Sequence, residues 1–502
     1  MEEIPGLSKQ CITFMKQITR RSFIRSSLFA TAAVTLPARS WAQVLGANGD
    51  IRLAVVGFNG QGKGHIEAFR KIPGVRVVAL CDVDKDVLER EAQKFRDRSE
   101  PIDTYTDVRK LLDSGSIDAI STATPNHWHA LISIWACQAG KDVYVEKPVS
   151  HNVWEGRQIV NAARKYNRIV QTGTQSRSSQ GIKQAIAWLN EGHLGKIRVA
   201  RGLCYKPRAS IGKVSAPHDP PPSVEYDLWC GPAPKTPLMR TKLHYDWHWV
   251  WPTGNGDLGN QGIHQMDIAR WFLGEEELSP RVFSIGGRLG YVDDGTTPNT
   301  QIIVHGYPKA PLIFEVRGLP KDKAHQAAGL WKAENMDKYK GGSVAVVIEC
   351  EGGHIFVPDY TKAIVIDNNG KEIKRFTGAS SHHANFIDAV RSRKRTDLNG
   401  DILEGHLSSA LCHTGNISYR LGQQSSPERV RERIKGDKEA LEAFERFSEH
   451  LAANGVDLQS TRATIGPMLK MDPATERFKG SRAANALLTR EYRAPFLVPH
   501  NV

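Results

Sequence analysis

The hydrophobic pattern of the first half of the chain predicts a sheet of buried parallel strands. Three apolar runs, at residues 51–56, 75–80 and 117–122, have the length and continuity of strands that are covered on both faces. A fourth strand, β-branched and aromatic, lies at residues 142–148. Helical patterns separate these runs. The alternation predicts a doubly wound α/β domain of the Rossmann type over residues 50–173.

Beyond residue 173 the pattern changes to longer strands in which polar and apolar residues alternate. Hairpin-like, glycine-containing connections predict a large, open, mainly antiparallel sheet in an α+β domain over residues 174–422. Helical patterns at residues 384–393 and 404–421 are expected to pack alongside it. Residues 423–502 form a charged C-terminal extension of unknown role. The candidate strands are residues 197–205, 282–287, 301–304, 312–317, 344–350, 354–357 and 363–366.

The turn after the first strand predicts a dinucleotide site. The sequence Gly-Phe-Asn-Gly-Gln-Gly contributes Gly57, Gly60 and Gly62 between a strand and a helix, where backbone N–H groups and the helix N-terminus bind a pyrophosphate. Asn59 replaces the middle glycine of the usual pattern, and Asn tolerates a left-handed φ. Asp82 follows about 20 residues later, where a carboxylate accepts hydrogen bonds from the ribose and favours NAD over NADP. The alternative is a surface Asp that caps a helix.

The carboxyl end of the fourth strand carries Lys147, within the sequence Glu-Lys-Pro. Ligands of open parallel sheets bind beyond the carboxyl ends of the strands, and Pro148 fixes the backbone beside the Lys. After the third strand, Asn126 or a nearby histidine is placed to face a nicotinamide. His127 and His129 themselves are interpreted as helix-surface or capping residues.

These motifs, in this order and at these spacings, resemble the N-terminal half of the Gfo/Idh/MocA superfamily of NAD(P)-dependent sugar oxidoreductases. The resemblance implies NAD as the cofactor and adds Thr124, Asn126 and Glu146 to the residues that hold it. It places Lys147, a cofactor contact as well, between the nicotinamide ribose and the substrate hydroxyl. The superfamily's open second-domain sheet also implies a homo-oligomer.

A Pro-rich segment at residues 206–253 ends in the sequence His-Tyr-Asp-Trp-His-Trp-Val-Trp. Aromatic faces stack on the C–H faces of sugar rings, which makes Trp247 and Trp249 candidate substrate contacts. Tyr245 and His248 are candidates for handling a proton on the substrate or its leaving group. A loop that packs the domain junction explains the same composition, and the sequence does not choose between the two.

The segment after this loop carries the expected general acid/base. In the superfamily this position reads roughly Asp-x-Gly-x-His at the start of a helix, and here it reads Asn-Gln-Gly-Ile-His. The resemblance makes His264 the acid/base, with Lys147 as its partner or substitute. Asn260 and Gln261 would hold the substrate, but an amide does not shuttle a proton. Asp267, further along the helix, is expected to make structural bonds.

Charge and cysteine content narrow the functional class. The formal net charge is +13 over 502 residues, without a lysine-rich tail or an aromatic-interleaved basic patch, so nucleic-acid binding is not expected. The seven cysteines include no Cys-x-x-Cys pair, which argues against structural zinc and a dense disulfide framework, and no metal site is assigned. No apolar stretch after the first 42 residues is long enough to span a membrane.

Residues 1–42 are expected to be a twin-arginine signal peptide. Arg20 and Arg21 precede a mildly apolar stretch at residues 28–37, and small residues up to Ala42 suit a signal peptidase. This pattern predicts export of the folded protein to the periplasm. A start at Met15 would place the arginine pair closer to the N-terminus.

The combined features predict an NAD-dependent oxidoreductase that acts on a hydroxyl of a sugar or glycoside. The Tyr245-x-x-His248 pattern, the Gly-Asn-Gln-Gly-x-His sequence and the leader also resemble the branch that contains NAD-dependent α-N-acetylgalactosaminidase-type glycosidases. That branch implies an alternative, a redox-neutral glycosidase or lyase that works through transient C3 oxidation and elimination. Export favours a redox-neutral cycle, because the periplasm has no evident supply of fresh NAD. A catalytically silent NAD-holding or sugar-binding protein is the third possibility.

Overall fold

The N-terminal half of the chain forms a six-stranded parallel sheet. The computed structural model describes residues 49–502, so the expected signal peptide lies outside the described residues. The strand order is β3-β2-β1-β4-β5-β6, which is the order of dinucleotide-binding Rossmann folds. The order reverses between β1 and β4, and their carboxyl ends flank the crevice where such folds bind ligands. The strands are β1 (Ile51–Val56), β2 (Val75–Cys81), β3 (Asp103–Tyr105), β4 (Ala119–Thr122), β5 (Asp142–Val145) and β6 (Val170–Thr172).

Helices cover both faces of this sheet, as the buried strands require. One face packs on α3 (Gly62–Arg70), α4 (Lys85–Arg96) and α12 (His382–Ser392). The other packs on α5 (Val108–Leu112), α6 (Asn126–Gln138) and α7 (Val153–Lys165). The helix α12 comes from a point some 200 residues after the last strand of the sheet, so the C-terminal half of the chain completes the N-terminal core.

The second half of the chain forms a twelve-stranded sheet, which confirms the predicted fold class. Its order is β14-β13-β12-β11-β7-β10-β9-β8-β16-β15, with β17 paired to β8 and β18 to β17. Among the strand pairs described in this second sheet, only β10 and β7 run parallel. The strands are β7 (Ile197–Tyr205), β8 (Arg281–Gly287), β9 (Thr300–His305), β10 (Leu312–Arg317), β11 (Val344–Cys350), β12 (Gly353–Val357), β13 (Lys362–Asp367), β14 (Glu372–Thr377), β15 (Gln423–Ser425), β16 (Ala463–Ile465), β17 (Leu469–Asp472) and β18 (Arg477–Lys479).

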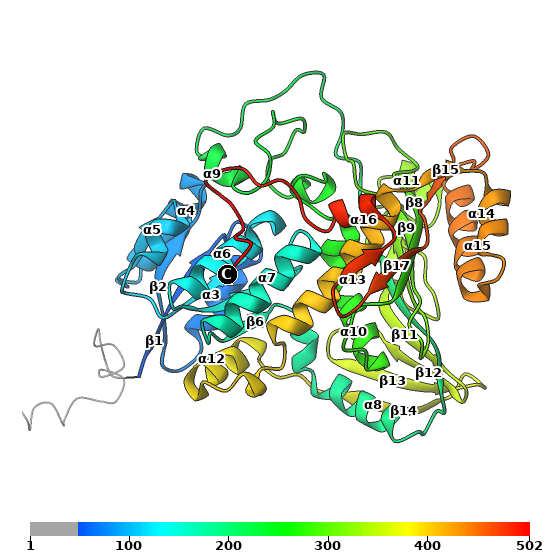
Figure 1. Ribbon diagram of the computed structural model, residues 1–502, viewed down its shortest axis with the longest axis horizontal. Helices are drawn as coiled ribbons and strands as arrows, with labels where there is room; N and C mark the ends of the chain where they lie inside the picture. Colours follow the sequence, from blue (N-terminus) through cyan, green and yellow to red (C-terminus); the bar gives the residue numbers. More distant parts are fainter. Residues whose placement is uncertain (1–48) are drawn as a thin grey trace, which may run out of the picture. The chain divides into compact units, whose positions relative to one another are not determined.

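Three helices cover the inner face of the large sheet and join it to the Rossmann half. These are α8 (Gln180–Asn190), α10 (Ile263–Leu273) and α13 (Ile402–Arg420). The helix α13 packs against both β8 and α7, so it belongs to the cores of both halves (Figure 1). Residues 51–502 accordingly form one compact unit.

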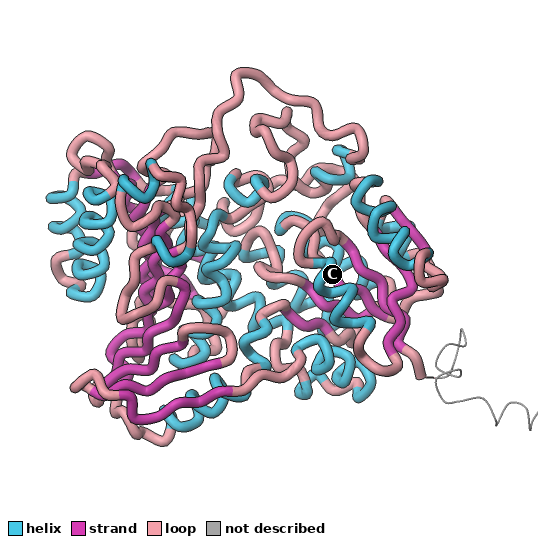
Figure 2. The backbone as a smooth tube through the Cα atoms, turned by 180° about the vertical axis from the view of Figure 1, so that it is seen from behind, coloured by secondary structure: helices cyan, strands magenta, loops and turns pink. Residues whose placement is uncertain are grey.

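The C-terminal extension is part of this unit. Its helices α14 (Pro427–Ile434) and α15 (Lys438–Ala453) cover the outer face of the large sheet over β8, β9 and β10 (Figures 1 and 2). Its strands β15 to β18 extend the sheet. After α16 (Arg482–Ala486) the chain returns to the Rossmann half, where Phe496 packs against Trp128.

The six cysteines in the described residues are free and buried. Among the helices that the structure describes, none is long and apolar enough to cross a membrane.

Candidate functional site

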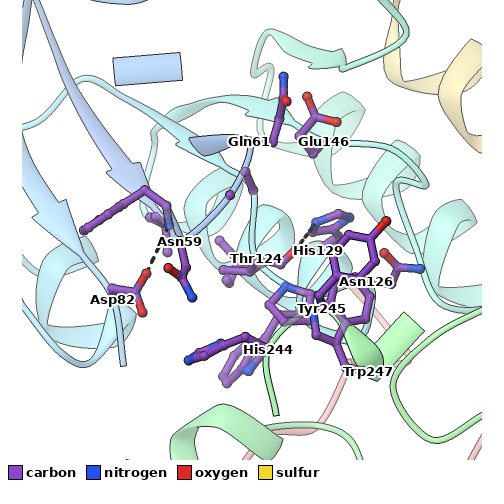
Figure 3. Close-up of a pocket in the computed structure, with 18 of the residues that line it drawn as sticks. Asn59, Gln61, Asp82, Thr124, Asn126, His129, Glu146, His244, Tyr245 and Trp247 are labelled. Carbon is purple, nitrogen blue, oxygen red and sulfur yellow. Dashed lines mark hydrogen bonds between the residues drawn. The ribbon is translucent and has the colours of Figure 1, made fainter. Parts of the chain in front are cut away.

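A cavity of about 610 Å³ lies at the carboxyl ends of β1, β2, β4 and β5, and residues from the other half of the chain close it. Most of the predicted site residues line it, although they come from segments more than 200 residues apart (Figure 3). Gly62 and Trp249 are the exceptions. The predicted residues on the wall are Gly57, Asn59, Gly60, Asp82, Thr124, Asn126, Glu146, Lys147, Tyr245, Trp247, His248, Asn260, Gln261 and His264.

Two glycines give the turn after β1 its shape. Gly57 has a φ of 74°, and a Cβ there would lie 2.7 Å from Thr124 Cγ2. A Cβ on Gly62 would lie 2.1 Å from the Gly57 carbonyl oxygen, so Gly62 serves the close packing of α3 against the turn. Asn59 does not adopt a positive φ; its side-chain oxygen accepts a hydrogen bond from Arg90. The tight turn and the start of α3 fit a dinucleotide pyrophosphate.

Asp82 stands at the end of β2 on the cavity wall and holds the glycine turn. Its carboxylate accepts hydrogen bonds from the backbone N–H groups of Phe58, at 3.0 Å, and Asp84, at 3.1 Å. Burial raises the pKa of Asp82, and the two backbone bonds oppose this shift. The cap of α4 is Asp84 and not Asp82, so the helix-cap interpretation of Asp82 is wrong. A carboxylate in this place fits the ribose of a bound NAD.

Glu146 belongs to a buried chain of polar groups that the sequence did not reveal. Its Oε1 lies 3.0 Å from His65 Nε2, and His65 Nδ1 lies 2.8 Å from Ser121 Oγ. Burial alone would raise the pKa of Glu146, but hydrogen bonding to His65 and the charge of Lys147 bring it to about 2. Ser121 is fully buried, so this Ser-His-Glu arrangement has no accessible nucleophile. It keeps an ionised carboxylate beside Lys147.

Lys147 links the two halves of the chain at the cavity. Its ammonium donates a 2.9 Å hydrogen bond to the backbone carbonyl oxygen of Asn260. Burial lowers the pKa of Lys147, and the positive charges of Lys206 and Arg208 add to this shift while Glu146 opposes it. With a lowered pKa, Lys147 gives up its proton more readily than an ordinary lysine does.

His264 faces the cavity from the second position of α10. A π-helical turn, Leu258–Gly262, precedes the helix; such turns occur frequently at functional sites. The ring of His264 is 6% exposed, lies 4.9 Å from the ring of Tyr360, and its Nδ1 has no hydrogen-bond partner. Burial, followed by the charge of Lys147, lowers its pKa to about 3. The imidazole is therefore neutral at pH 7, and its Nδ1 is free to accept a hydrogen bond from a substrate hydroxyl.

The aromatic loop places some of its side chains on the cavity wall and packs others away from it. Trp247 lines the cavity and stacks on His248, with 3.6 Å between the ring centroids. Burial lowers the pKa of His248 to about 3. Trp249 is 5% exposed and packs under the Arg208 guanidinium, so its assignment as a substrate contact is corrected to a packing role. Tyr245 is 53% exposed and occupies a γ-turn with φ 68° and ψ −49°, a strained conformation of a kind found at ligand sites.

The whole segment between residues 206 and 253 reaches across the cavity and is tied to the Rossmann half. It has a small core of its own that includes Trp229. Val224 forms a β-bridge with Asp84, and His244 Nε2 lies 2.9 Å from the Asp84 carboxylate. From the C-terminal end of the chain, Arg493 forms an ion pair with Asp227, at 2.9 Å.

Several cavity groups carried no local signal in the sequence. Lys206 and Tyr360 line the wall beside Gln261. Arg208 forms a buried bidentate pair with Asp257 and also donates to the Tyr245 hydroxyl at 2.9 Å. Lys206 and Arg208 follow β7, Asp257 precedes the π-helical turn, and Tyr360 lies between β12 and β13, so only the packing brings these segments together.

His127 and His129 are not helix-surface residues, as the sequence had indicated. Both are buried: His127 contacts the Trp229 carbonyl oxygen, and His129 contacts those of Thr124 and Pro148. They fasten α6 to the segments around the cavity. Within residues 49–502, no group of three or more His, Cys, Asp or Glu side chains is arranged to hold a metal ion.

Two family models match the chain in order. The oxidoreductase-family model for the NAD-binding Rossmann fold of Gfo/Idh/MocA proteins matches residues 51–174, and the model for the C-terminal α/β domain matches residues 187–305.

Curated relatives carry two kinds of name. A glycosyl hydrolase family 109 protein of Solibacter usitatus is 33% identical over 123 residues, which cover 23% of this chain and 28% of that protein. One of Saccharopolyspora erythraea is 27% identical over 220 residues, 42% of each. The chain thus spans less than half the length of these relatives. Myo-inositol 2-dehydrogenase of Thermotoga maritima is 23% identical over 288 residues, 53% of this chain and 74% of that enzyme.

Solved structures share the fold at low sequence identity. The WlbA dehydrogenase of Bordetella pertussis, solved with NADH and UDP-GlcNAcA, has a TM-score of 0.53 at 19% identity and covers 72% of this chain and 94% of its own. An NAD-binding protein of Listeria innocua has a TM-score of 0.52 at 15% identity, and the match covers 73% of this chain and 94% of that protein. With both domain models matched in order on this fold, residues 51–174 are the NAD-binding Rossmann domain and residues 187–305 are the C-terminal α/β domain of the Gfo/Idh/MocA oxidoreductase family.

Proposed function

We propose that this protein is an NAD-dependent oxidoreductase that acts on a hydroxyl of a sugar or glycoside. The observation that carries the proposal is the meeting of Lys147 and His264, from the two halves of the chain, on the wall of the cavity that the glycine turn and Asp82 also line. Bound NAD supplies the hydride acceptor. The chain's own residues must then remove the hydroxyl proton and orient the carbon.

The proton leaves the substrate oxygen as hydride leaves the same carbon, which becomes a carbonyl. His264 is neutral at pH 7 and accepts this proton. Lys147, held by the Asn260 carbonyl oxygen, either donates a hydrogen bond to the substrate oxygen or passes the proton on. Trp247 lines the cavity and offers a face for the sugar ring.

A redox-neutral glycosidase or lyase is the second candidate, because the cavity holds further proton-handling groups in Tyr245 and His248. After oxidation at C3, one of them removes the acidified C2 proton, and the anomeric substituent leaves with the bonding electrons. Water then adds at C1, C2 regains a proton, and hydride returns to C3. The net change is hydrolysis without consumption of NAD. The glycosyl hydrolase family 109 names of several relatives support this candidate.

Export is part of the proposal. The twin-arginine pattern at residues 19–42 supports transport of the folded, cofactor-loaded protein to the periplasm. A redox-neutral cycle suits that compartment, because each turnover restores NAD.

One experiment separates the candidates. The purified protein is assayed for bound NAD by its absorbance, then mixed with free sugars while reduction is followed at the NADH band, and finally screened against aryl glycosides without added cofactor. Sugar-dependent reduction supports the oxidoreductase, and glycoside cleavage without added NAD supports the redox-neutral cycle. Bound NAD with neither activity in a broad screen would contradict both.

A further inference from the structure

Two lysines line the cavity, and consecutive residues of the π-helical turn hold them. Lys147 donates to the backbone carbonyl oxygen of Asn260 at 2.9 Å, and Lys206 donates to the side-chain oxygen of Gln261 at 2.7 Å. Both acceptors are neutral. Across residues 49–502, no carboxylate lies within ion-pair distance of either ammonium. The lysines therefore face the cavity without a contacting counter-charge.

The nearest carboxylates are already engaged. Asp257 accepts two hydrogen bonds from Arg208, at 2.9 and 2.8 Å. Glu146 is bonded to His65. A charge in a partly buried place without a partner costs free energy, and a bound anion would offset that cost here.

The local bonding also prepares Lys206 to receive an anion. The amide nitrogen of Gln261 donates a 2.7 Å hydrogen bond to the Tyr360 hydroxyl. This bond orients the amide so that the side-chain oxygen of Gln261 points toward Lys206. An ammonium has three donors, and the Gln261 bond uses one of them. The neutral amide fixes the position of the ammonium and leaves its charge unbalanced.

We propose that the substrate carries an anionic oxyacid group, a carboxylate or a phosphate or sulfate ester, which binds Lys206 beside Lys147. This inference rests on the proposed function, because it names the substrate class of the same site. The pyrophosphate of NAD is not the anion concerned, since it fits the glycine turn after β1, whereas Lys147 follows β5 and Lys206 follows β7. Acidic sugars are therefore the expected substrates, in preference to their neutral counterparts.

The competing explanation gives Lys206 a positioning role only. Its positive charge is among the causes that lower the pKa of Lys147, and a lysine can be kept ready for proton transfer in this way. That role predicts a changed pH dependence of turnover and no preference for anionic ligands. Binding measurements therefore separate the two explanations.

The test compares matched sugars on the NAD-loaded, full-length protein by titration calorimetry. The probes are glucuronate against glucose, galacturonate against galactose, and glucose 6-phosphate and glucose 6-sulfate against glucose. We expect the anionic member of at least one pair to bind about 10- to 100-fold more tightly, the scale of one charge-assisted hydrogen bond, and the gap to shrink with added salt. The uronate and ester arms identify which oxyacid the site takes.

Lys206→Gln should remove the difference in affinity between the anionic and the neutral sugar of a pair. Lys206→Arg, which keeps the positive charge, should retain most of that difference. Equal or tighter binding of the neutral sugars to the unchanged protein overturns the inference, as does binding of no anionic probe. A gap that survives in Lys206→Gln, or a Lys206→Gln effect confined to the pH profile of turnover, also overturns it. If neutral sugars reduce the bound NAD and anionic ones do not bind, this inference fails alone. If no sugar or glycoside reacts, the proposed function fails, whatever the binding gap.

Discussion

Two residues of α10, three positions apart, should separate catalysis from stability when they are replaced. His264 faces the cavity, and its Nδ1 has no hydrogen-bond partner. His264→Ala should therefore lower the turnover rate by about 10²-fold or more, the scale of a lost acid/base group. NAD occupancy and the free energy of unfolding should change little, because the ring gives up no hydrogen bond. Lys147→Met should lower turnover by a similar factor.

Asp267 points to the other side of the helix, into the core. Its carboxylate accepts hydrogen bonds from Arg177 Nε at 2.9 and 3.0 Å and from Ser408 Oγ at 2.7 Å, and it is fully buried. Asp267→Asn leaves the buried Arg177 with Glu404, at 2.9 Å, as its remaining carboxylate. We expect a loss of about 3 kcal/mol in the free energy of unfolding, the lower end of the range for a buried ion pair that loses one partner.

The assay measures turnover, NAD occupancy and urea unfolding for both variants in parallel. We expect opposite outcomes for the two variants. His264→Ala should lose turnover and keep its stability, whereas Asp267→Asn should lose stability and keep its turnover per folded molecule. Near-normal turnover in His264→Ala would refute the assignment of the proton acceptor and make Tyr245 or His248 the first candidate. An unchanged unfolding curve for Asp267→Asn would refute the structural role of that carboxylate.

Three further predictions concern the cofactor, acid stability and export. Asp82→Ala should narrow the preference for NAD over NADP in equilibrium binding, because the carboxylate that repels a 2′-phosphate is gone; equal binding of both cofactors by the unchanged protein would contradict this. Burial lowers the pKa values of His305 and His413 to about 3, below the ordinary 6.5, so below pH 6.5 the unfolded chain binds protons that the folded chain does not. The Tm should therefore fall from pH 7 to pH 4, and a constant Tm over that range would count against these values. Replacing Arg20 and Arg21 by Lys should leave the protein in the cytoplasm of the expressing cell, and a normal periplasmic yield from the double variant would rule out the export signal.

The strands that could be predicted are those with a buried face. The runs at residues 51–56, 197–205, 312–317 and 344–350 coincide with β1, β7, β10 and β11, because burial demands apolar residues at every position or at alternate ones. The strand β14 was missed for the opposite reason. It forms the edge of the sheet, and of its six residues only Phe376 is buried, so its sequence carries almost no hydrophobic pattern.

The site residues differ in the same way: some are positioned by the sequence next to them, and others only by contacts between distant segments. The positions of the glycine turn and of Lys147 could be predicted because each directly follows a strand that the sequence shows. The end of that strand fixes where the following residues lie. The positions of Tyr360 and Lys206 could not be predicted, because they reach the cavity only when separate strands of the large sheet assemble. His127 was placed on a helix surface because polar residues usually lie there. Here α6 is covered on several sides, by α7 and by the segment around Trp229, and its polar residues are buried.

The segment at residues 206–253 has a consequence for how long the cofactor stays bound. It is fastened across the cavity by the Asp84–Val224 bridge, by His244 on Asp84 and by Arg493 on Asp227. These contacts join three distant parts of the chain, so we expect them to slow the release of a dinucleotide from the cavity. We expect a residence time longer than a catalytic cycle, with NAD behaving as a prosthetic group and not as a co-substrate. A protein that keeps its dinucleotide in this way would have to restore the starting oxidation state of its NAD in every cycle, either within one substrate or through a second substrate that takes up the hydride.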